Sequence, residues 1–193
     1  MGTIRVAATV EATEAEGPGA RYALWAQGCS HRCPGCCNPR MFDPKGGRAV
    51  GVPDVLAAIA RVRDRIEGVT LLGGEPFDQA APLAEVARGA RALGLSVLTF
   101  SGYTLEELEA LPAPGVRELL EATDLLVDGR FDASRPERER RWAGSTNQRF
   151  HFLTDRYTPG IERIHPGEPE RTVELRIAPS GEVFANGWPE MPQ

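Results

Sequence analysis

The stretch Gly28-Cys29-Ser30-His31-Arg32-Cys33-Pro34-Gly35-Cys36 places three cysteines within eight residues, in a CxxxCxxC spacing. Four thiolates would close a metal site. Three can hold three corners of a cubane iron–sulfur cluster and leave the fourth iron open to a small molecule. Thiolates are soft ligands that suit iron–sulfur clusters or zinc. The run therefore predicts a metal-binding loop, with Cys29, Cys33 and Cys36 as its ligands.

A zinc site completed by Cys37 or His31 is the alternative interpretation of this loop. Structural zinc usually takes two separated pairs of ligands, whereas every candidate here lies in one loop. Because Cys37 directly follows Cys36, we expect its side chain to point elsewhere and to be a small, partly buried non-ligand. His31, His151 and His165 are not spaced as a ligand set, and we expect loop or surface histidines.

A short apolar run leads into this loop, and further apolar runs alternate with helical patterns after it. The predicted strands are 22–25, 69–72, 95–100 and 125–127, and the predicted helices are 53–66, 80–93, a stretch opened by a capping box at Thr104–Glu107, and 116–122. Such alternation indicates parallel βαβ units, and strands this apolar are expected to be covered on both faces. We therefore predict an α/β fold, an incomplete parallel (β/α) barrel open at one side. A further strand at 150–153 and a hairpin of 173–177 and 183–185 are expected beyond it.

Each of the four predicted parallel strands is followed by a chemically distinctive segment. In chain order these are Cys29, Gly73-Gly74-Glu75-Pro76, Ser101-Gly102-Tyr103 and Asp128-Gly129-Arg130. In a parallel barrel all of them fall on the C-terminal rim, where active sites gather, so we expect one shared pocket.

Each of these segments has a functional and a structural interpretation. Gly73 and Gly74 permit a close approach of the backbone, or simply a tight turn. The Glu75 carboxylate beside them can bind an ammonium group. Ser101 can bond a ribose hydroxyl or form a turn, and Asp128 can bind a polar ligand group or cap its own loop.

Length and composition predict one domain over residues 1–193, with 155–193 as a C-terminal extension that packs on the barrel. The net charge of −5 argues against bulk nucleic-acid binding, and no apolar run approaches the length of a membrane span. We see no signal peptide, so four clustered cysteines indicate metal binding or catalysis rather than disulfides. A cytoplasmic protein is expected.

On these residues the chain resembles the radical S-adenosylmethionine (SAM) superfamily, and within it the activating proteins of anaerobic ribonucleotide reductase. The resemblance covers roughly residues 3–153. The shared segments are Gly17-Pro18-Gly19-Ala20-Arg21, Gln27-Gly28-Cys29, Cys33-Pro34-Gly35-Cys36, Asn38-Pro39, Gly73-Gly74-Glu75-Pro76, Ser101-Gly102-Tyr103, Leu126-Val127-Asp128-Gly129-Arg130-Phe131 and Gly144-Ser145-Thr146-Asn147-Gln148.

The resemblance implies that Cys29, Cys33 and Cys36 hold one 4Fe–4S cluster whose open iron is chelated by SAM. The main chain around Gly35, Cys36 and Cys37 is then expected to touch the adenine. Gly73, Gly74 and Glu75 are expected to hold the methionyl amine, and Ser101 and Asp128 to contact SAM.

In this family one electron cleaves SAM to methionine and a 5′-deoxyadenosyl radical, which takes a hydrogen from a backbone glycine of a partner enzyme. The implied partners are a glycyl-radical enzyme and an electron donor such as flavodoxin or ferredoxin. A small radical SAM enzyme that modifies a peptide or another protein is the alternative. A non-catalytic iron–sulfur electron carrier is a third, against which the Gly73–Pro76 segment argues because a carrier needs no amine site.

Two features depart from the branch. Cys37 stands where an aromatic residue is often found, and the tail from Asp155 to Gln193 exceeds the usual short activase. We expect this tail to cover the open barrel or to bind a substrate.

Overall fold

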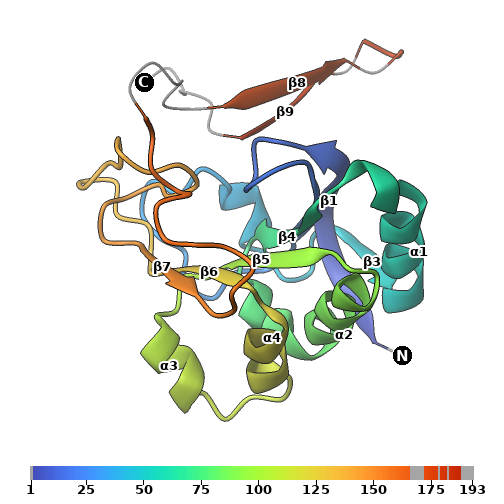
Figure 1. Ribbon diagram of the computed structural model, residues 1–193, viewed down its shortest axis with the longest axis horizontal. Coiled ribbons are helices and arrows are strands. Elements are labelled where there is room, and N and C mark those ends of the chain that lie inside the picture. The colour runs from blue at the N-terminus through green and yellow to red at the C-terminus, as the bar shows by residue number, and fades with distance from the viewer. Residues whose placement is uncertain (1, 166–171, 178, 182, 188–193) are drawn as a thin grey trace.

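A computed structural model describes residues 2–165, 172–177, 179–181 and 183–187. Seven strands form one sheet in the order β3-β1-β2-β4-β5-β6-β7, and two more form a separate hairpin (Figure 1). β2, β4, β5 and β6 are parallel, whereas β1, β3 and β7 run antiparallel to their neighbours. The strands are β1 (Thr3–Thr13), β2 (Arg21–Ala26), β3 (Arg48–Gly51), β4 (Gly68–Gly73), β5 (Ser96–Phe100), β6 (Leu125–Asp128), β7 (Arg149–Phe152), β8 (Val173–Ile177) and β9 (Val183–Gly187).

The predicted α/β class is confirmed, with a central sheet that is mostly parallel. The sheet is open, and the strands described form no closed barrel. The antiparallel strands β1 and β3 were not predicted. β1 lacks an apolar run because Ala, Thr and charged residues fill most of its positions, and only Ile4, Val6 and Thr13 of it are buried.

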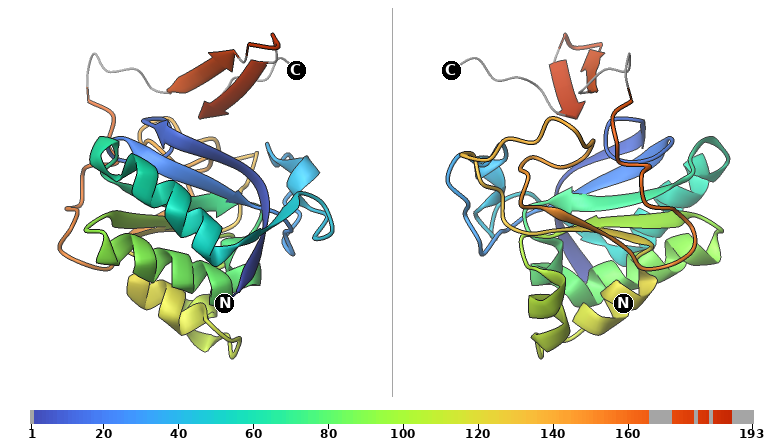
Figure 2. Two further views of the ribbon diagram at one scale, coloured as in Figure 1. Left: turned by 90° about the vertical axis from the view of Figure 1, so that its right-hand side faces the viewer. Right: turned by 60° about the vertical axis from the view of Figure 1, so that its left-hand side comes forward.

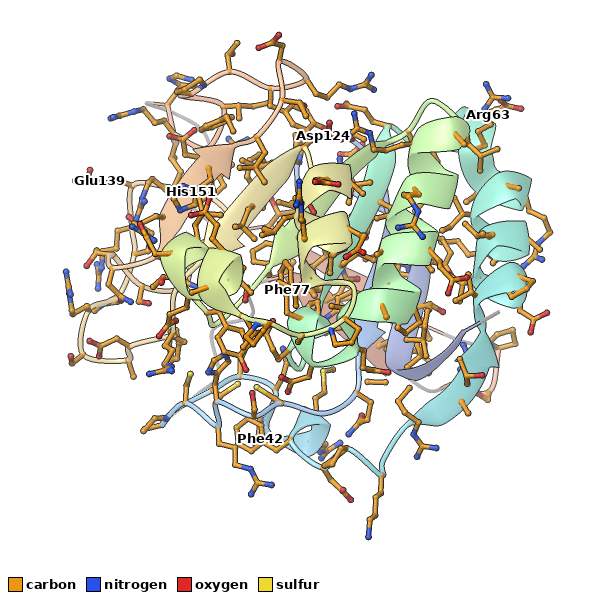
Figure 3. The ribbon with its side chains drawn as sticks, turned by 90° about the horizontal axis from the view of Figure 1, so that it is seen from below. Phe42, Arg63, Phe77, Asp124, Glu139 and His151 are labelled. Atoms are coloured by element: carbon orange, nitrogen blue, oxygen red, sulfur yellow. The ribbon has the colours of Figure 1, made fainter. Side chains whose placement is uncertain are left out.

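The helices gather on one face of the sheet (Figure 2). They are α1 (Val52–Val62), α2 (Ala80–Ala92), α3 (Leu105–Ala110) and α4 (Val116–Ala122), with 3₁₀ turns η1 (Pro39–Met41), η2 (Arg63–Arg65) and η3 (Pro76–Gln79). Seen from below, they form a layer in front of the strands (Figure 3). The capping box predicted at the start of α3 is present. The backbone N–H of Glu107 donates to the Thr104 side chain, and the backbone N–H of Thr104 donates to the Glu107 side chain. None of the helices in the described ranges is long and apolar enough to cross a bilayer.

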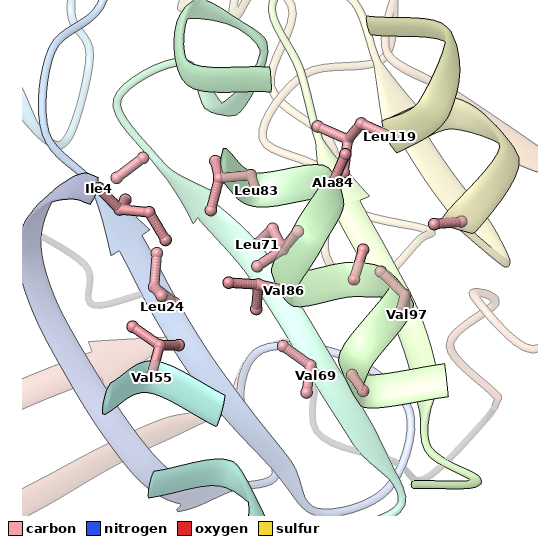
Figure 4. Packing of buried hydrophobic residues seen from close by; sticks show 14 of the residues in the cluster. Ile4, Leu24, Val55, Val69, Leu71, Leu83, Ala84, Val86, Val97 and Leu119 are labelled. Carbon is pink, nitrogen blue, oxygen red and sulfur yellow. The ribbon is translucent and has the colours of Figure 1, made fainter. Parts of the chain in front are cut away.

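Two hydrophobic clusters cover the two faces of the parallel strands. The larger one packs α1, α2 and α4 on the sheet, with Leu24, Leu71 and Val97 meeting residues such as Leu83 and Leu119 (Figure 4). The smaller cluster lies on the other face. Its buried members are Leu98, Leu125, Val127 and Tyr157. The expectation of strands covered on both faces therefore holds for the centre of the sheet, with loop residues rather than helices on the second face.

Tyr157 ties the chain beyond β7 to the beginnings of the parallel strands. Its hydroxyl donates to Glu67 Oε1 (2.8 Å) and accepts from the guanidinium of Arg21 (3.0 Å). Arg21 is fully buried and also donates to Thr70 Oγ1 (2.7 Å). A buried guanidinium needs partners of this kind, so the segment that carries Tyr157 is part of the packed domain.

The hairpin β8–β9 docks on the turn between β1 and β2, beyond the sheet from α2 and α4 (Figure 2). Arg176 donates to the carbonyl of Ala12 (2.8 Å), and the Gly187 N–H donates to Glu16 Oε1 (2.6 Å). The opposite face of the hairpin leaves Leu175 and Ile177 66% and 74% exposed. The predicted strands 173–177 and 183–185 are confirmed. The rest of the predicted extension, residues 166–171, 178, 182 and 188–193, lies outside the described residues.

Candidate metal and ligand site

A cavity of about 1540 Å³ extends from the carboxyl ends of the parallel strands to the β1–β2 turn, where Ala15 and Glu16 line it. Segments that follow all four of these strands contribute to its wall, as the order of motifs along the sequence predicts. The sequence-predicted residues in the lining are Cys29, Cys33, Cys36, Cys37, Gly73, Gly74, Glu75 and Ser101. Gly35 and Asp128 are not part of it. The hairpin adds Arg176, Phe184 and Asn186 to the opposite side of the mouth.

The cysteine loop runs from β2 to η1 and is fixed at its base by main-chain contacts. The backbone N–H of Gly28 donates to the carbonyl of Met41 (2.8 Å), and the side-chain amide of the buried Gln27 donates to the carbonyl of Asp43 (2.7 Å). Arg32 adopts φ = 50°, a left-handed conformation that is uncommon outside glycine. The turn at Arg32 lets the loop fold back over the strand ends. In Figure 3 the Phe42 end of this segment runs along one edge of the molecule.

All four cysteines are free thiols, and three of them are partly exposed. Burial raises the pKa of Cys29, against hydrogen bonds from the backbone N–H groups of Arg32 and His31. The Cys37 thiol donates to Cys36, which lowers the pKa of Cys36 to about 6 and raises that of Cys37. Cys37 is exposed, so the expectation of a partly buried residue is wrong.

The donor set fits an iron–sulfur cluster. Within the described part of the chain, no three His, Cys, Asp or Glu side chains are grouped as the ligands of one metal ion would be. Cluster thiolates bind three different irons and stand farther apart than ligands that share one ion. Three soft thiols on one loop, all lining one cavity, are the donor set of a cluster that keeps one iron open.

Gly73 and Gly74 are required by the close contact between the ends of β2 and β4. A Cβ on Gly74 would lie 2.0 Å from the carbonyl oxygen of Gly28, and one on Gly73 would lie 2.7 Å from Trp25 Cα. The N–H of Glu75 donates to the Gly28 carbonyl (2.8 Å). These glycines therefore seat the Gly73–Pro76 segment directly against the chain that leads into Cys29.

The Glu75 carboxylate joins the ends of β4 and β5. It is 1% exposed and accepts from the backbone N–H of Phe77 (2.9 Å), the hydroxyl of Ser101 (3.0 Å) and the backbone N–H of Gly102 (2.7 Å). Ser101 thus reaches the site through Glu75. A buried carboxylate held by three donors stays in one orientation at the cavity wall.

His31 takes part in the site in a way that the sequence did not predict. It is a loop histidine, as expected, but its side chain is only 5% exposed, with Nε2 3.3 Å from Glu75 Oε2. Arg130 donates to its Nδ1 (3.2 Å), and Tyr103 packs edge-to-face on the ring at 4.3 Å. The one sequence feature that could have indicated this role is the position of His31 between Cys29 and Cys33, where a side chain faces either the solvent or the strand ends.

Asp128 is fully buried, but its carboxylate turns away from the cavity. It accepts from the backbone N–H of Leu105 (2.6 Å) and from Arg149 Nε (3.0 Å), and lies 2.8 Å from His151 Nε2. His151 therefore also has a defined partner that the sequence did not reveal. The geometry corresponds to the structural interpretation of Asp128, in which it caps a neighbouring segment.

Known proteins match over most of this chain. A family described as a 4Fe-4S single cluster domain matches residues 15–151. The anaerobic ribonucleoside-triphosphate reductase-activating protein of Salmonella typhimurium is 33% identical over 144 residues, which is 71% of this chain and 91% of that protein. Proteins of the same name from Escherichia coli K12 (31% identical, 71% and 91% covered) and from phage T4 (29%, 72% and 88%) are also similar. These matches confirm the resemblance found in the cysteine loop and the Gly73–Pro76 segment. The chain belongs to the 4Fe-4S single cluster domain family and, within it, to the branch of the anaerobic ribonucleoside-triphosphate reductase-activating enzymes.

Proposed function

We propose that this protein is a radical SAM enzyme that reductively cleaves SAM and activates a glycyl-radical partner of the anaerobic ribonucleotide reductase type. One observation carries the proposal. The three thiols of the CxxxCxxC loop and the Gly73–Glu75 segment line the same cavity, at the ends of adjacent parallel strands. In this proposal the open sheet is the incomplete barrel of the radical SAM fold.

Cys29, Cys33 and Cys36 would hold the cluster. When bound, a 4Fe–4S cluster supplies one electron that breaks the carbon–sulfur bond of SAM, giving methionine and a 5′-deoxyadenosyl radical. The chain's own contribution is to orient SAM and to keep water away from the reacting atoms. The buried Trp25 and the partly buried Phe100 give the wall the apolar surface that this requires.

SAM would be held mainly by backbone near two glycines and one carboxylate. We assign the methionyl amine to the Gly73–Glu75 segment, where the only charge is the buried Glu75 carboxylate. The adenine is assigned to the main chain around Gly35, Cys36 and Cys37. Asp128 is left out of these contacts because its carboxylate already serves Leu105, Arg149 and His151.

The size of the cavity supports a macromolecular substrate. Small-molecule pockets are typically about 300–1,000 Å³, and this cavity of about 1540 Å³ exceeds that range. The surplus would admit a glycine-bearing loop beside SAM. The relatives' names favour a reductase over another protein or peptide as the partner. We propose that the protein works in the cytoplasm and draws its electron from a flavodoxin or ferredoxin.

Anaerobic reconstitution tests the cofactor part of the proposal. The wild-type chain should take up about four irons and, with reductant, convert SAM to methionine and 5′-deoxyadenosine. Replacing Cys29, Cys33 or Cys36 by Ala should abolish SAM cleavage. Cys37→Ala is the matched control, and it should keep the cluster. Stoichiometric zinc without iron uptake in protein purified without oxygen would contradict the proposal.

Electron paramagnetic resonance tests the partner. A ribonucleotide reductase from the same organism should gain a glycyl-radical signal when it is mixed with the reduced enzyme and SAM. If SAM is cleaved, no reductase gains a radical and a peptide is modified instead, the activating role fails while SAM cleavage stands.

A further inference from the structure

We propose that His31 is a positioning residue that locks the cysteine loop to the ends of β4, β5 and β6. It lies between the thiols of Cys29 and Cys33 in the sequence, yet its ring is buried among side chains from three strand ends. This assignment rests on the proposed function, because the distance it fixes is the one that SAM would have to span.

The ring occupies a seat that the neighbouring backbone leaves open for it. A Cβ on Gly102 would lie 2.3 Å from His31 Cδ2, so any larger residue at 102 would collide with the imidazole. Tyr103 closes the seat from the side, with its ring centroid 4.3 Å away. The loop can therefore approach β5 this closely only because position 102 is glycine.

The two ring nitrogens face groups of opposite kind. Arg130 Nε is a donor, so Nδ1 of His31 accepts and the proton of the neutral ring sits on Nε2. Nε2 is buried and makes no hydrogen bond of good geometry, and Glu75 Oε2 lies 3.3 Å from it. Arg130 at the end of β6 thus orients the imidazole, and the imidazole presents its N–H side to the carboxylate of β4.

The consequence is a fixed separation between two halves of the ligand site. The thiols belong to the cysteine loop, whereas the Gly73–Glu75 segment continues directly from β4 of the sheet. A ligand that touches both halves binds more tightly when they are held in place beforehand, because less freedom is lost on binding. His31 would supply that rigidity through its contacts to Glu75, Tyr103 and Arg130.

A four-protein cycle of wild type, His31→Ala, Gly102→Ala and the double variant tests the seat. In reconstituted protein, His31→Ala should keep its iron but bind SAM about tenfold more weakly, as expected for the loss of a contact to a charged group. Gly102→Ala should do the same by displacing the ring. The double variant should be no worse than His31→Ala, because the added methyl then fills vacated space. Losses that multiply to about a hundredfold, or single variants that bind like wild type, overturn the proposal.

Two conservative variants separate positioning from simple packing. Gln at 31 can place an N–H where Nε2 lies, whereas Asn reaches only the position of Nδ1. His31→Gln should therefore recover most of the affinity and His31→Asn should not. Equal behaviour of the two would refute the assigned role of Nε2. His165→Ala, a histidine that does not line the cavity, is the matched control and should bind SAM like wild type.

Urea unfolding of the same four proteins distinguishes this proposal from the function it rests on. If wild-type protein binds no SAM, the proposed function fails. The His31 proposal then stands or falls on the unfolding free energies, where the single losses should again not add in the double variant.

Discussion

Several contacts within the site converge on the carboxylate of Glu75. It is a buried charge that receives hydrogen bonds from η3 and from the end of β5, and it also faces His31. Such a group has two roles here. It joins two strand ends, and it would supply the negative charge that an ammonium group needs.

Glu75→Ala separates these two roles. Removing the carboxylate leaves the N–H groups of Phe77 and Gly102 without an acceptor, which should lower the free energy of unfolding by about 1–3 kcal/mol. SAM affinity should fall about ten- to a hundredfold, while the three thiols still hold the cluster. Chemical denaturation, equilibrium binding and iron analysis measure the three effects.

Glu106→Ala is the control for this change. Glu106 also lies just beyond the end of β5, but it is exposed, pairs with Arg149 and is not part of the cavity wall. Its loss should leave SAM binding unchanged. Unchanged SAM affinity in Glu75→Ala would remove Glu75 from the amine site.

At this scale the sequence predicted residue types better than orientations. The cysteines, Gly73–Glu75 and Ser101 were found because their spacing and their place after apolar strands are visible in one dimension. The burial of His31, and the orientation of the Asp128 carboxylate away from the cavity, were not predicted. Both depend on partners more than 20 residues away, Glu75 and Arg130 for His31 and Arg149 for Asp128, and no local pattern reports such contacts.

Among the elements, the parallel strands and their helices were predicted to within a few residues, because continuous apolar runs and helical periodicity are local signals. β4 is Gly68–Gly73 against a predicted 69–72, and α4 is Val116–Ala122 as predicted. The predicted helix 53–66 ends as an α-helix at Val62 and continues as η2. β1 and β3 escaped prediction because strands of mixed composition are defined by their pairing, here with β2 and with each other, and not by an apolar run.

Tyr157, in the segment after β7, allows a prediction about how this segment is held to the sheet. Tyr157→Phe keeps the ring in the smaller hydrophobic cluster but removes the hydroxyl that Arg21, Ser96 and Glu67 share. Because Arg21 stays buried with fewer partners, the free energy of unfolding should fall by about 1–3 kcal/mol. Iron uptake and SAM cleavage should persist, because this network lies at the beginnings of the strands, away from the cavity. Thermal or urea unfolding measures the first effect.

Phe152→Leu is a useful comparison, since it alters the same cluster without touching the polar network. A Tyr157→Phe protein as stable as wild type would show that the hydroxyl network contributes little to holding this segment.

For the whole molecule, the hairpin forms part of the cavity wall beside the β1–β2 turn. Arg176, Phe184 and Asn186 line the cavity, and polar contacts to the β1–β2 turn hold the hairpin in place. A chain ended after His165 keeps the sheet, the cysteine loop and Tyr157. It should therefore still take up iron and cleave SAM, whereas the partner concentration for half-maximal activation should rise about tenfold, equivalent to ~1.4 kcal/mol.

The measurement is the glycyl-radical yield as a function of partner concentration. The matched control is the double variant Leu175→Ser and Ile177→Ser, which changes only the exposed face of the hairpin and should activate the partner like wild type. A truncated protein that activates the partner like wild type would show that the hairpin has no part in recognition.

The hairpin contact also has a consequence for how the protein is made. Glu174 accepts a hydrogen bond from the backbone of Glu14, a residue 160 positions earlier in the chain. A ribosome releases the β1–β2 turn and the cysteine loop long before β8 and β9. Throughout that interval the wall of the cavity beside the β1–β2 turn lacks the residues that the hairpin contributes. A carrier that delivers iron and sulfide during synthesis would therefore meet a cavity that is still open at that end.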